Sequence, residues 1–405
     1  MRHRGPGHPG SSPDPYDGSP EAETEGWRAT LPAVLGRPFL PGNRVTVFQN
    51  GVRIFPALLA AIASARQTIE LETYLFEDGT VARSFAEALA QAAGRGVLVR
   101  IVLDAVGSMR SADAVARMLE AGVEVRWFRP VSRWRVWRRA TVDNRTHRRI
   151  LVVDDEVSFL GGVGIADEWE GDARGPQEWR ETHFEIRGPA VASLHAAFLG
   201  HWIECGPLDA DLLRPVRPVP AGDSEILVLP TVGIEARSGP SLLYHALTRH
   251  ARRRVRITTP YFVPDGSTAE SILACAARGV EVELLLPGPH TDHRVCNIAG
   301  TPTLRTLHES GVRIWRYQPT FIHTKAITVD GVLSVVGSAN LNHRSLVKDD
   351  EALAIVLDAA LTAELDRAFD SDVASSLPAT GETLLDPGPV RRLVEWVVRR
   401  GRRQL

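Results

Sequence analysis

Two histidines with matching neighbours are the residues of this chain best suited to chemistry. Residues 323–330 read His-x-Lys-x-x-x-x-Asp, and residues 147–154 repeat the spacing with Arg in place of Lys. Glycine follows each motif at the same offset, as Gly337 and Gly161. One short match is weak evidence, but two matches in register within one chain indicate a duplicated functional motif.

Each motif is expected to place an imidazole beside a permanent cation. Residues at positions i and i+2 of an extended segment share a face. His323 therefore lies beside Lys325, and His147 lies beside Arg149. Further along the second motif, Ser338 and Asn340 offer a hydroxyl and an amide that can bind phosphate oxygens or orient a neighbour.

The acidic residues that close the motifs, Asp154 and Asp330, are included among the candidate catalytic residues. Their position, i+7, has the opposite parity to the histidines, and turn-forming residues follow them. We therefore expect both carboxylates to fix the end of a strand through local hydrogen bonds rather than to take part in bond breaking.

Two such motifs can meet across a pseudo-twofold axis and form one pocket with two imidazoles and two cations. That pocket suits a phosphodiester. One neutral imidazole can attack phosphorus and form a covalent phosphohistidine, while the other protonates the leaving alcohol. Lys325, Arg149 and the Asn340 amide would hold the phosphate oxygens. Because the basic side chains supply positive charge, we predict no metal ion and no cofactor.

The elements around the motifs also occur twice. Strands and helices alternate with short glycine turns, and Tyr74, Gly96 and Gly122 have counterparts at nearly constant offset in the second half of the chain. We predict an α/β protein of two tandem α/β/α units with mostly parallel sheets, packed about a pseudo-twofold axis around one active site.

The predicted organisation has four parts. Residues 1–44 are rich in Gly, Pro and acidic residues and are expected to be a disordered tail. Residues 45–220 form half one, and residues 221–378 form half two. Residues 379–405 form a basic amphipathic helix, which is expected either to lie on an anionic membrane or to dock on the protein.

Composition restricts the possible partners and compartment. The 405 residues carry a net charge of -2, which argues against a general nucleic-acid binder. Three cysteines without CxxC spacing suit a reducing cytosol, and no apolar run is long enough to span a bilayer.

An insertion rich in Arg and Trp directly precedes His147 and has no counterpart before His323. It can lie at a lipid interface, stack on single-stranded nucleic acid, or be a solvated loop; we favour an entrance for lipid. The residues assigned to this entrance are Arg133, Trp134, Arg135, Trp137 and Arg138.

The paired motifs resemble those of the phospholipase D superfamily over about residues 45–370. Residues 71–76, 179–183, 259–264 and 337–345 are similar to bacterial cardiolipin synthases of that superfamily. The resemblance implies transfer of a phosphatidyl group from phosphatidylglycerol to a second lipid alcohol. It also implies a peripheral enzyme at the cytoplasmic face of the cell membrane.

The resemblance further assigns roles to individual residues. In many members the histidine of the first half is the nucleophile and that of the second half is the acid and base, which implies these roles for His147 and His323. Glu351 matches a carboxylate that orients a motif histidine.

Two positions depart from the family pattern. Arg149 stands where the family has Lys, and Gly164 stands where it usually has Asn. Two alternatives therefore stay open. One is a hydrolase of the same fold, acting on phospholipid or nucleic acid, and the other is a catalytically impaired protein that binds phosphate or lipid.

Overall fold

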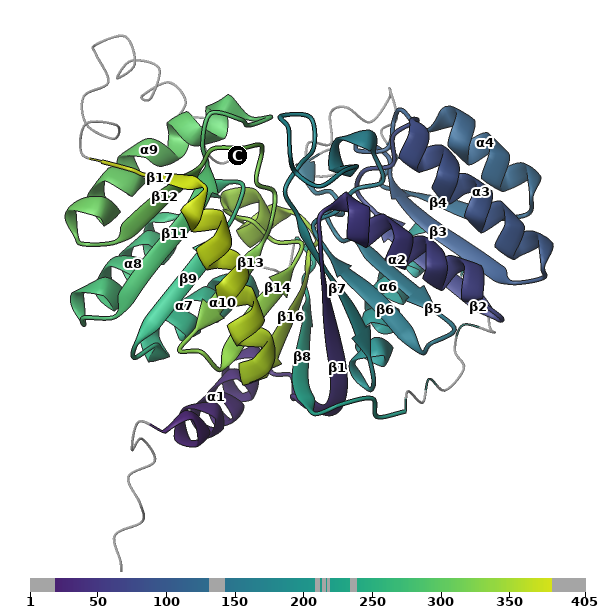
Figure 1. Ribbon diagram of the computed structural model, residues 1–405. Helices are drawn as coiled ribbons and strands as arrows, with labels where there is room; N and C mark the ends of the chain where they lie inside the picture. Colours follow the sequence, from purple (N-terminus) through teal and green to yellow (C-terminus); the bar gives the residue numbers. More distant parts are fainter. Residues whose placement is uncertain are drawn as a thin grey trace, which may run out of the picture.

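In the computed structural model, the described residues are 19–130, 143–207, 212, 216, 219–233 and 239–380. They form two α/β halves that lie side by side, with β8 (Ser224–Pro230) and β1 (Leu40–Gln49) between them (Figure 1). The boundary predicted near residue 220 lies between α6 (Ala190–Cys205) and β8.

The helices and strands follow one another in the same general order in both halves. Half one contains β1 Leu40–Gln49, α2 Gly51–Ser64, β2 Thr68–Thr73, α3 Thr80–Gly94, β3 Leu98–Asp104, α4 Ala112–Glu120, β4 Glu124–Phe128, β5 Ile150–Val153, β6 Val157–Gly161, a 3-10 turn at Asp167–Trp169, β7 Thr182–Arg187 and α6 Ala190–Cys205. Half two contains β8 Ser224–Pro230, α7 Gly239–His250, β9 Arg254–Thr258, β10 Phe262–Val263, α8 Gly266–Ala277, β11 Glu281–Pro287, α9 Arg294–Glu309, β12 Arg313–Tyr317, β13 Ala326–Val329, β14 Leu333–Gly337, β15 Leu341–Asn342, a π-helical turn at Arg344–Lys348, β16 Ala352–Leu357, α10 Ala359–Ala374 and β17 Ser376–Pro378.

One sheet runs through both halves in the order β17-β12-β11-β9-β13-β14-β16-β8-β1-β7-β6-β5-β2-β3-β4. The predicted α/β class is confirmed, but the prediction of mostly parallel sheets is wrong. Within the described sheet, only β2–β3, β3–β4, β9–β11 and β11–β12 are parallel neighbours. Strands joined through a helix run parallel, whereas β5–β6 and β13–β14 are joined by tight turns that force antiparallel pairing.

Three apolar clusters make up most of the core. One belongs mainly to half two and one to half one. The third lies between them and contains Phe184 and Ile186 of half one with Val336 and Val356 of half two. The two halves therefore share a continuous interior.

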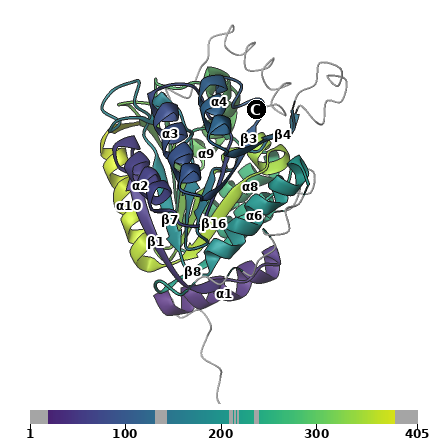
Figure 2. The ribbon, with the colours of Figure 1, turned by 90° about the vertical axis from the view of Figure 1, so that its right-hand side faces the viewer.

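The prediction of a disordered tail over residues 1–44 is wrong from Pro20 onwards. Helix α1, Pro20–Leu35, begins after Ser19, whose side chain accepts a hydrogen bond from the Ala22 backbone N–H. Trp27 and Leu31, four residues apart, are buried in the half-two core, which brings α1 beneath the sheet (Figure 2). This apolar pair stabilises the helix although the segment around it has the composition of a tail.

Several predictions lie outside the described residues. The assigned entrance residues fall within residues 131–142, and most of the C-terminal helix falls within residues 381–405. Among the described helices, none is both long enough and apolar enough to cross a membrane.

Candidate active site

The two motif histidines lie at the seam between the halves, each beside a segment of the opposite half. The His147 N–H donates to the Asp350 carbonyl at 2.8 Å, and the His323 N–H donates to the Arg180 carbonyl at 2.7 Å. Matching isolated bridges join Thr146 to Asp350 and Arg180 to Ile322. The same backbone arrangement therefore occurs twice, as a pseudo-twofold axis requires.

Each histidine is paired with a carboxylate from the other half. His147 Nδ1 is 2.9 Å from Glu351 Oε1, and His323 Nδ1 is 2.6 Å from Glu181 Oε2. Both carboxylates are fully buried. Because an ionised carboxylate can only accept, it favours the tautomer with hydrogen on Nδ1 and leaves Nε2 available for substrate.

The motif cations lie beside the same two rings. Arg149 donates to the His147 carbonyl at 2.8 Å, and one of its nitrogens is 3.0 Å from His147 Nε2. Lys325 donates to the His323 carbonyl at 2.6 Å and lies 3.1 Å from His323 Nε2. These short contacts put a positive charge at each nitrogen that a phosphate would approach.

Burial and the cations keep both imidazoles neutral. Burial and then Arg149 lower the pKa of His147 to about 4, with Glu351 acting in the opposite direction. Burial, Lys325 and Arg149 hold the pKa of His323 well below its ordinary value. Burial raises the pKa of Glu181, whereas hydrogen bonds from His147 and Ser338 help to keep that of Glu351 below its usual value despite burial.

The two histidines open into one cavity of about 410 Å³. Aromatic rings form much of its wall: Tyr74 packs edge-on against His147, and Trp169 packs edge-on against His323. The lining residues are Tyr74, Leu75, Val106, Arg145, His147, Arg149, Trp169, Trp179, Tyr261, Asp292, His293, Cys296, His323, Asn340, Asn342, Arg344, Ser345 and Asp349.

The two residues predicted to bind or orient phosphate have different surroundings. Asn340 lines the cavity, and its buried Oδ1 has no hydrogen-bond partner among the described residues. Ser338 does not line the cavity; its hydroxyl donates to Glu351 Oε2. The first position suits a ligand, and the second supports the carboxylate behind His147.

The position that lacks the family's Asn is filled by an aromatic ring. A Cβ atom at Gly164 would lie 2.9 Å from Cζ3 of Trp169 and 3.1 Å from Cβ of Leu75. The half-one wall of the cavity is therefore an indole where half two supplies the amide of Asn340.

The two motif aspartates lie at the far ends of their strands and do not line the cavity. Asp154 accepts hydrogen bonds from the backbone N–H groups of residues 66, 67 and 68. Asp330 accepts from those of residues 252, 253 and 254. This geometry agrees with the expected strand-end role, and it separates both carboxylates from the reacting centre.

Sequence reasoning did not include Glu181 among the site residues. Its counterpart in half two, Glu351, was identified. The separation from Gly161 to Glu181 differs from that between Gly337 and Glu351, so the two carboxylates do not align by spacing. Gly162 fits this arrangement, because a Cβ there would collide with the Glu181 carboxylate. The aromatic wall was missed because its rings come from separate loops.

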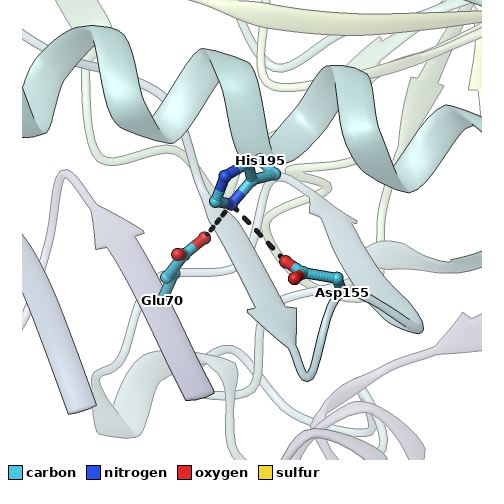
Figure 3. Close-up of side chains that lie close together, drawn as sticks. All are labelled: Glu70, Asp155 and His195. Carbon is cyan, nitrogen blue, oxygen red and sulfur yellow. Dashed lines mark hydrogen bonds and ion pairs between the residues drawn. The ribbon is translucent and has the colours of Figure 1, made fainter. Parts of the chain in front are cut away.

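Two groups of His and carboxylate side chains away from the cavity have possible ligand atoms within 4.8 Å of one another. They are Glu70, Asp155 and His195, drawn in Figure 3, and His201, Glu204 and Asp350. In each group the histidine is already bonded to a carboxylate. Neither group contributes a side chain to the catalytic cavity.

The duplication seen in the geometry is also recognised at the level of sequence families. A model described as "Cardiolipin synthase, PLD-like domain" matches residues 58–200 and again residues 244–373. The chain belongs to the phospholipase D superfamily. The resemblance predicted from the two motifs is therefore confirmed.

The similarity to relatives in the phospholipase D superfamily extends over most of the chain. Cardiolipin synthase A of Pseudomonas aeruginosa (strain LESB58) is 34% identical over 366 residues, covering 89% of this chain and 73% of that protein. Cardiolipin synthase A of Pseudomonas putida (strain GB-1) is 30% identical over 376 residues, covering 92% and 77%. This member of the superfamily is thus an enzyme of the phosphatidyltransferase type that resembles cardiolipin synthase.

The phospholipase D fold itself is supported by a solved structure. That of phosphatidylserine synthase from Haemophilus influenzae Rd KW20 superposes with a TM-score of 0.73 at 14% identity, covering 92% of this chain and 98% of that one. At this identity the similarity concerns the fold alone.

Proposed function

We propose that the protein is a cardiolipin synthase-like phosphatidyltransferase that acts on phosphatidylglycerol through a phosphohistidine. The observation that carries the proposal is the crossed pairing of two histidines with carboxylates of opposite halves, around one cavity. The similarity to two cardiolipin synthase A sequences supports the choice of lipid.

In the first step His147 is the nucleophile. Its ring is neutral, and its side chain is 13% exposed against 4% for His323. Nε2 attacks phosphorus, and the bond from phosphorus to the oxygen of the headgroup glycerol breaks. His323 delivers a proton to that oxygen, so free glycerol leaves. Glu351 stabilises the positive charge that develops on the attacking ring.

In the second step His323 acts as the base. It removes the proton from a hydroxyl group of a second phosphatidylglycerol, whose oxygen attacks the phosphohistidine. The phosphorus–nitrogen bond breaks and His147 is regenerated, so two phosphatidylglycerols give cardiolipin and glycerol. His323 must hold a proton before step one, and the anionic phosphate favours this by offsetting the nearby cations.

Arg149, Lys325 and Asn340 are proposed to hold the phosphate oxygens. Each cation already lies within about hydrogen-bond distance of Nε2 of its motif histidine, beside which the phosphate would bind. Because they supply positive charge at the phosphate, the proposal requires no metal ion.

The proposed substrate places the enzyme at a membrane. A phosphatidylglycerol headgroup must reach the cavity from the bilayer surface, so we propose peripheral association with the cytoplasmic face of the cell membrane. The Arg- and Trp-rich insertion before His147 suits headgroup depth and stays a sequence prediction.

Incubation of the purified protein with phosphatidylglycerol vesicles, followed by mass spectrometry, tests the proposal. Cardiolipin together with glycerol is the expected product pair, and His147→Asn or His323→Asn should abolish it. Phosphatidic acid without cardiolipin would assign the enzyme to the hydrolases. Cleavage of single-stranded DNA without turnover of any lipid would overturn the lipid assignment.

A further inference from the structure

A histidine outside the cavity joins the two halves of the protein. His201 lies on α6 of half one and is 2% exposed. Its Nδ1 is 2.5 Å from Glu72 Oε1 on β2, and its Nε2 is 3.0 Å from Asp350 Oδ2 of half two. Both carboxylates are fully buried. The contact with Asp350 is an ion pair without hydrogen-bond geometry, and through it one imidazole lies between two buried acids of different halves.

Both of these acids are held against the segments that carry the proposed catalytic residues. Glu72 Oε1 accepts a hydrogen bond from the Thr146 hydroxyl at 2.5 Å, one residue before His147. Asp350 directly precedes Glu351, and its carbonyl accepts the His147 N–H at 2.8 Å. The bridge thus fixes the backbone on both sides of the His147–Glu351 pair.

We infer that His201 is a positioning residue, which holds the segment carrying Glu351 in half two against the segment carrying His147 in half one. The inference rests on the proposed function, because it concerns the geometry of the proposed nucleophile. His201 touches neither the cavity around His147 nor any group assigned to the substrate.

The two acids beside His201 favour its cationic form. Burial alone would lower its pKa, but Glu72 and Asp350 hold the pKa above the ordinary value. The charged groups that face it from the surrounding elements are Glu72, Arg148, Asp350, Arg129 and Glu204. Without the imidazolium, the two acids would lose the cation that lies between them.

The opposite side of the active site has an equivalent anchor with reversed charges. Arg180 directly precedes Glu181, and its carbonyl accepts the His323 N–H at 2.7 Å. The Arg180 guanidinium is bonded at 3.0 Å to Asp372 on α10, the last helix of half two. In both cases the residue before the orienting carboxylate is tied to the last helix of the opposite half, which indicates a common role.

A matched control occurs on the same helix. His195 Nδ1 is 2.6 Å from Glu70 Oε2 and 3.6 Å from Asp155 Oδ1, again a buried imidazole beside two acids (Figure 3). All three residues belong to half one, and Asp155 lies in the turn after β5, at the end away from His147. Loss of this contact should affect stability without moving the catalytic pair.

The experiment compares His201→Gln with His195→Gln, since Gln keeps a donor but removes the charge. We expect His201→Gln to lower kcat for phosphatidylglycerol by about tenfold or more with little change in KM. Because Glu351 raises the pKa of His147, displacement of this carboxylate should lower that pKa, so the acid limb of the rate profile should move to lower pH. His195→Gln should retain the wild-type kcat and pH profile.

Equal kinetics of the two variants would overturn the inference, even if both melt at lower temperature. A readout without turnover separates this failure from failure of the proposed function. NMR titration of the His147 ring, assigned with His147→Asn, should show a lowered pKa in His201→Gln and an unchanged one in His195→Gln. If His201→Gln does not fold, Glu72→Gln removes one partner of the bridge and should produce the same shift; no shift there would contradict the inference.

Discussion

Replacing each of the two orienting carboxylates should slow a different chemical step. Comparing substrates whose leaving groups do and do not need a proton should distinguish the two steps. Glu351→Gln and Glu181→Gln preserve side-chain shape but remove the charge that faces Nδ1 of each histidine. The first change weakens the nucleophile, and the second weakens the acid that protonates the leaving alcohol.

The expected magnitude follows from the contacts. The two bonds measure 2.9 Å and 2.6 Å, and both carboxylates have 0% exposure. A hydrogen bond to a charged group at a buried site contributes about 1.5–3 kcal/mol. If the whole contribution is lost in the transition state, the rate falls by about 10-fold to 150-fold.

The assay compares phosphatidylglycerol with phosphatidyl-p-nitrophenol, whose leaving group departs without a proton. The initial burst of p-nitrophenol reports formation of the phosphohistidine. Glu181→Gln should recover nearly the wild-type burst rate with this substrate, whereas Glu351→Gln should stay slow with both. Equal losses for the two variants on both substrates would refute the division of roles between His147 and His323.

Four further changes test single features. Arg149→Lys should keep or raise turnover, because Lys retains the charge and is the family residue; complete loss would give the guanidinium a role of its own. Gly164→Asn should lower stability by about 1–3 kcal/mol through its clash with the neighbouring indole, measured by denaturant unfolding. Gly175→Asn is its control, because a Cβ added at Gly175 would have no heavy atom within 4 Å apart from its chain neighbours. Asp154→Ala should lower stability by about 1–3 kcal/mol while the folded fraction keeps its kcat; a normal midpoint with lost activity would contradict this. Because the pKa of His147 is lowered to about 4, kcat/KM for the p-nitrophenyl ester should stay level down to about pH 5, and an acid limb near 6.5 would disagree.

The sequence was sufficient to predict the duplicated α/β units, because their helices and strands have clear periods and glycine turns. It did not predict strand direction correctly in the middle of the sheet. That direction depends on whether a helix or a tight turn connects two strands, as at β5 and β6. Helix α1 was missed because two buried side chains outweigh the composition around them.

The motif residues of the site could also be predicted from the sequence, because their spacing repeats. Glu181 was not, since its role depends on contact across the seam between halves, which sequence separation conceals. The meaning of Gly164 likewise emerged only when the ring of Trp169 was seen to occupy the space beside it.

The apolar cluster shared by the two halves has a consequence for synthesis of the protein. Half one leaves the ribosome first, with Phe184 and Ile186 lacking the partners that half two provides. We therefore expect the nascent first half to depend on chaperones until β8 and β16 have emerged. Before that point His147 also lacks Glu351, so the proposed nucleophile has no orienting carboxylate until this part of half two has been made.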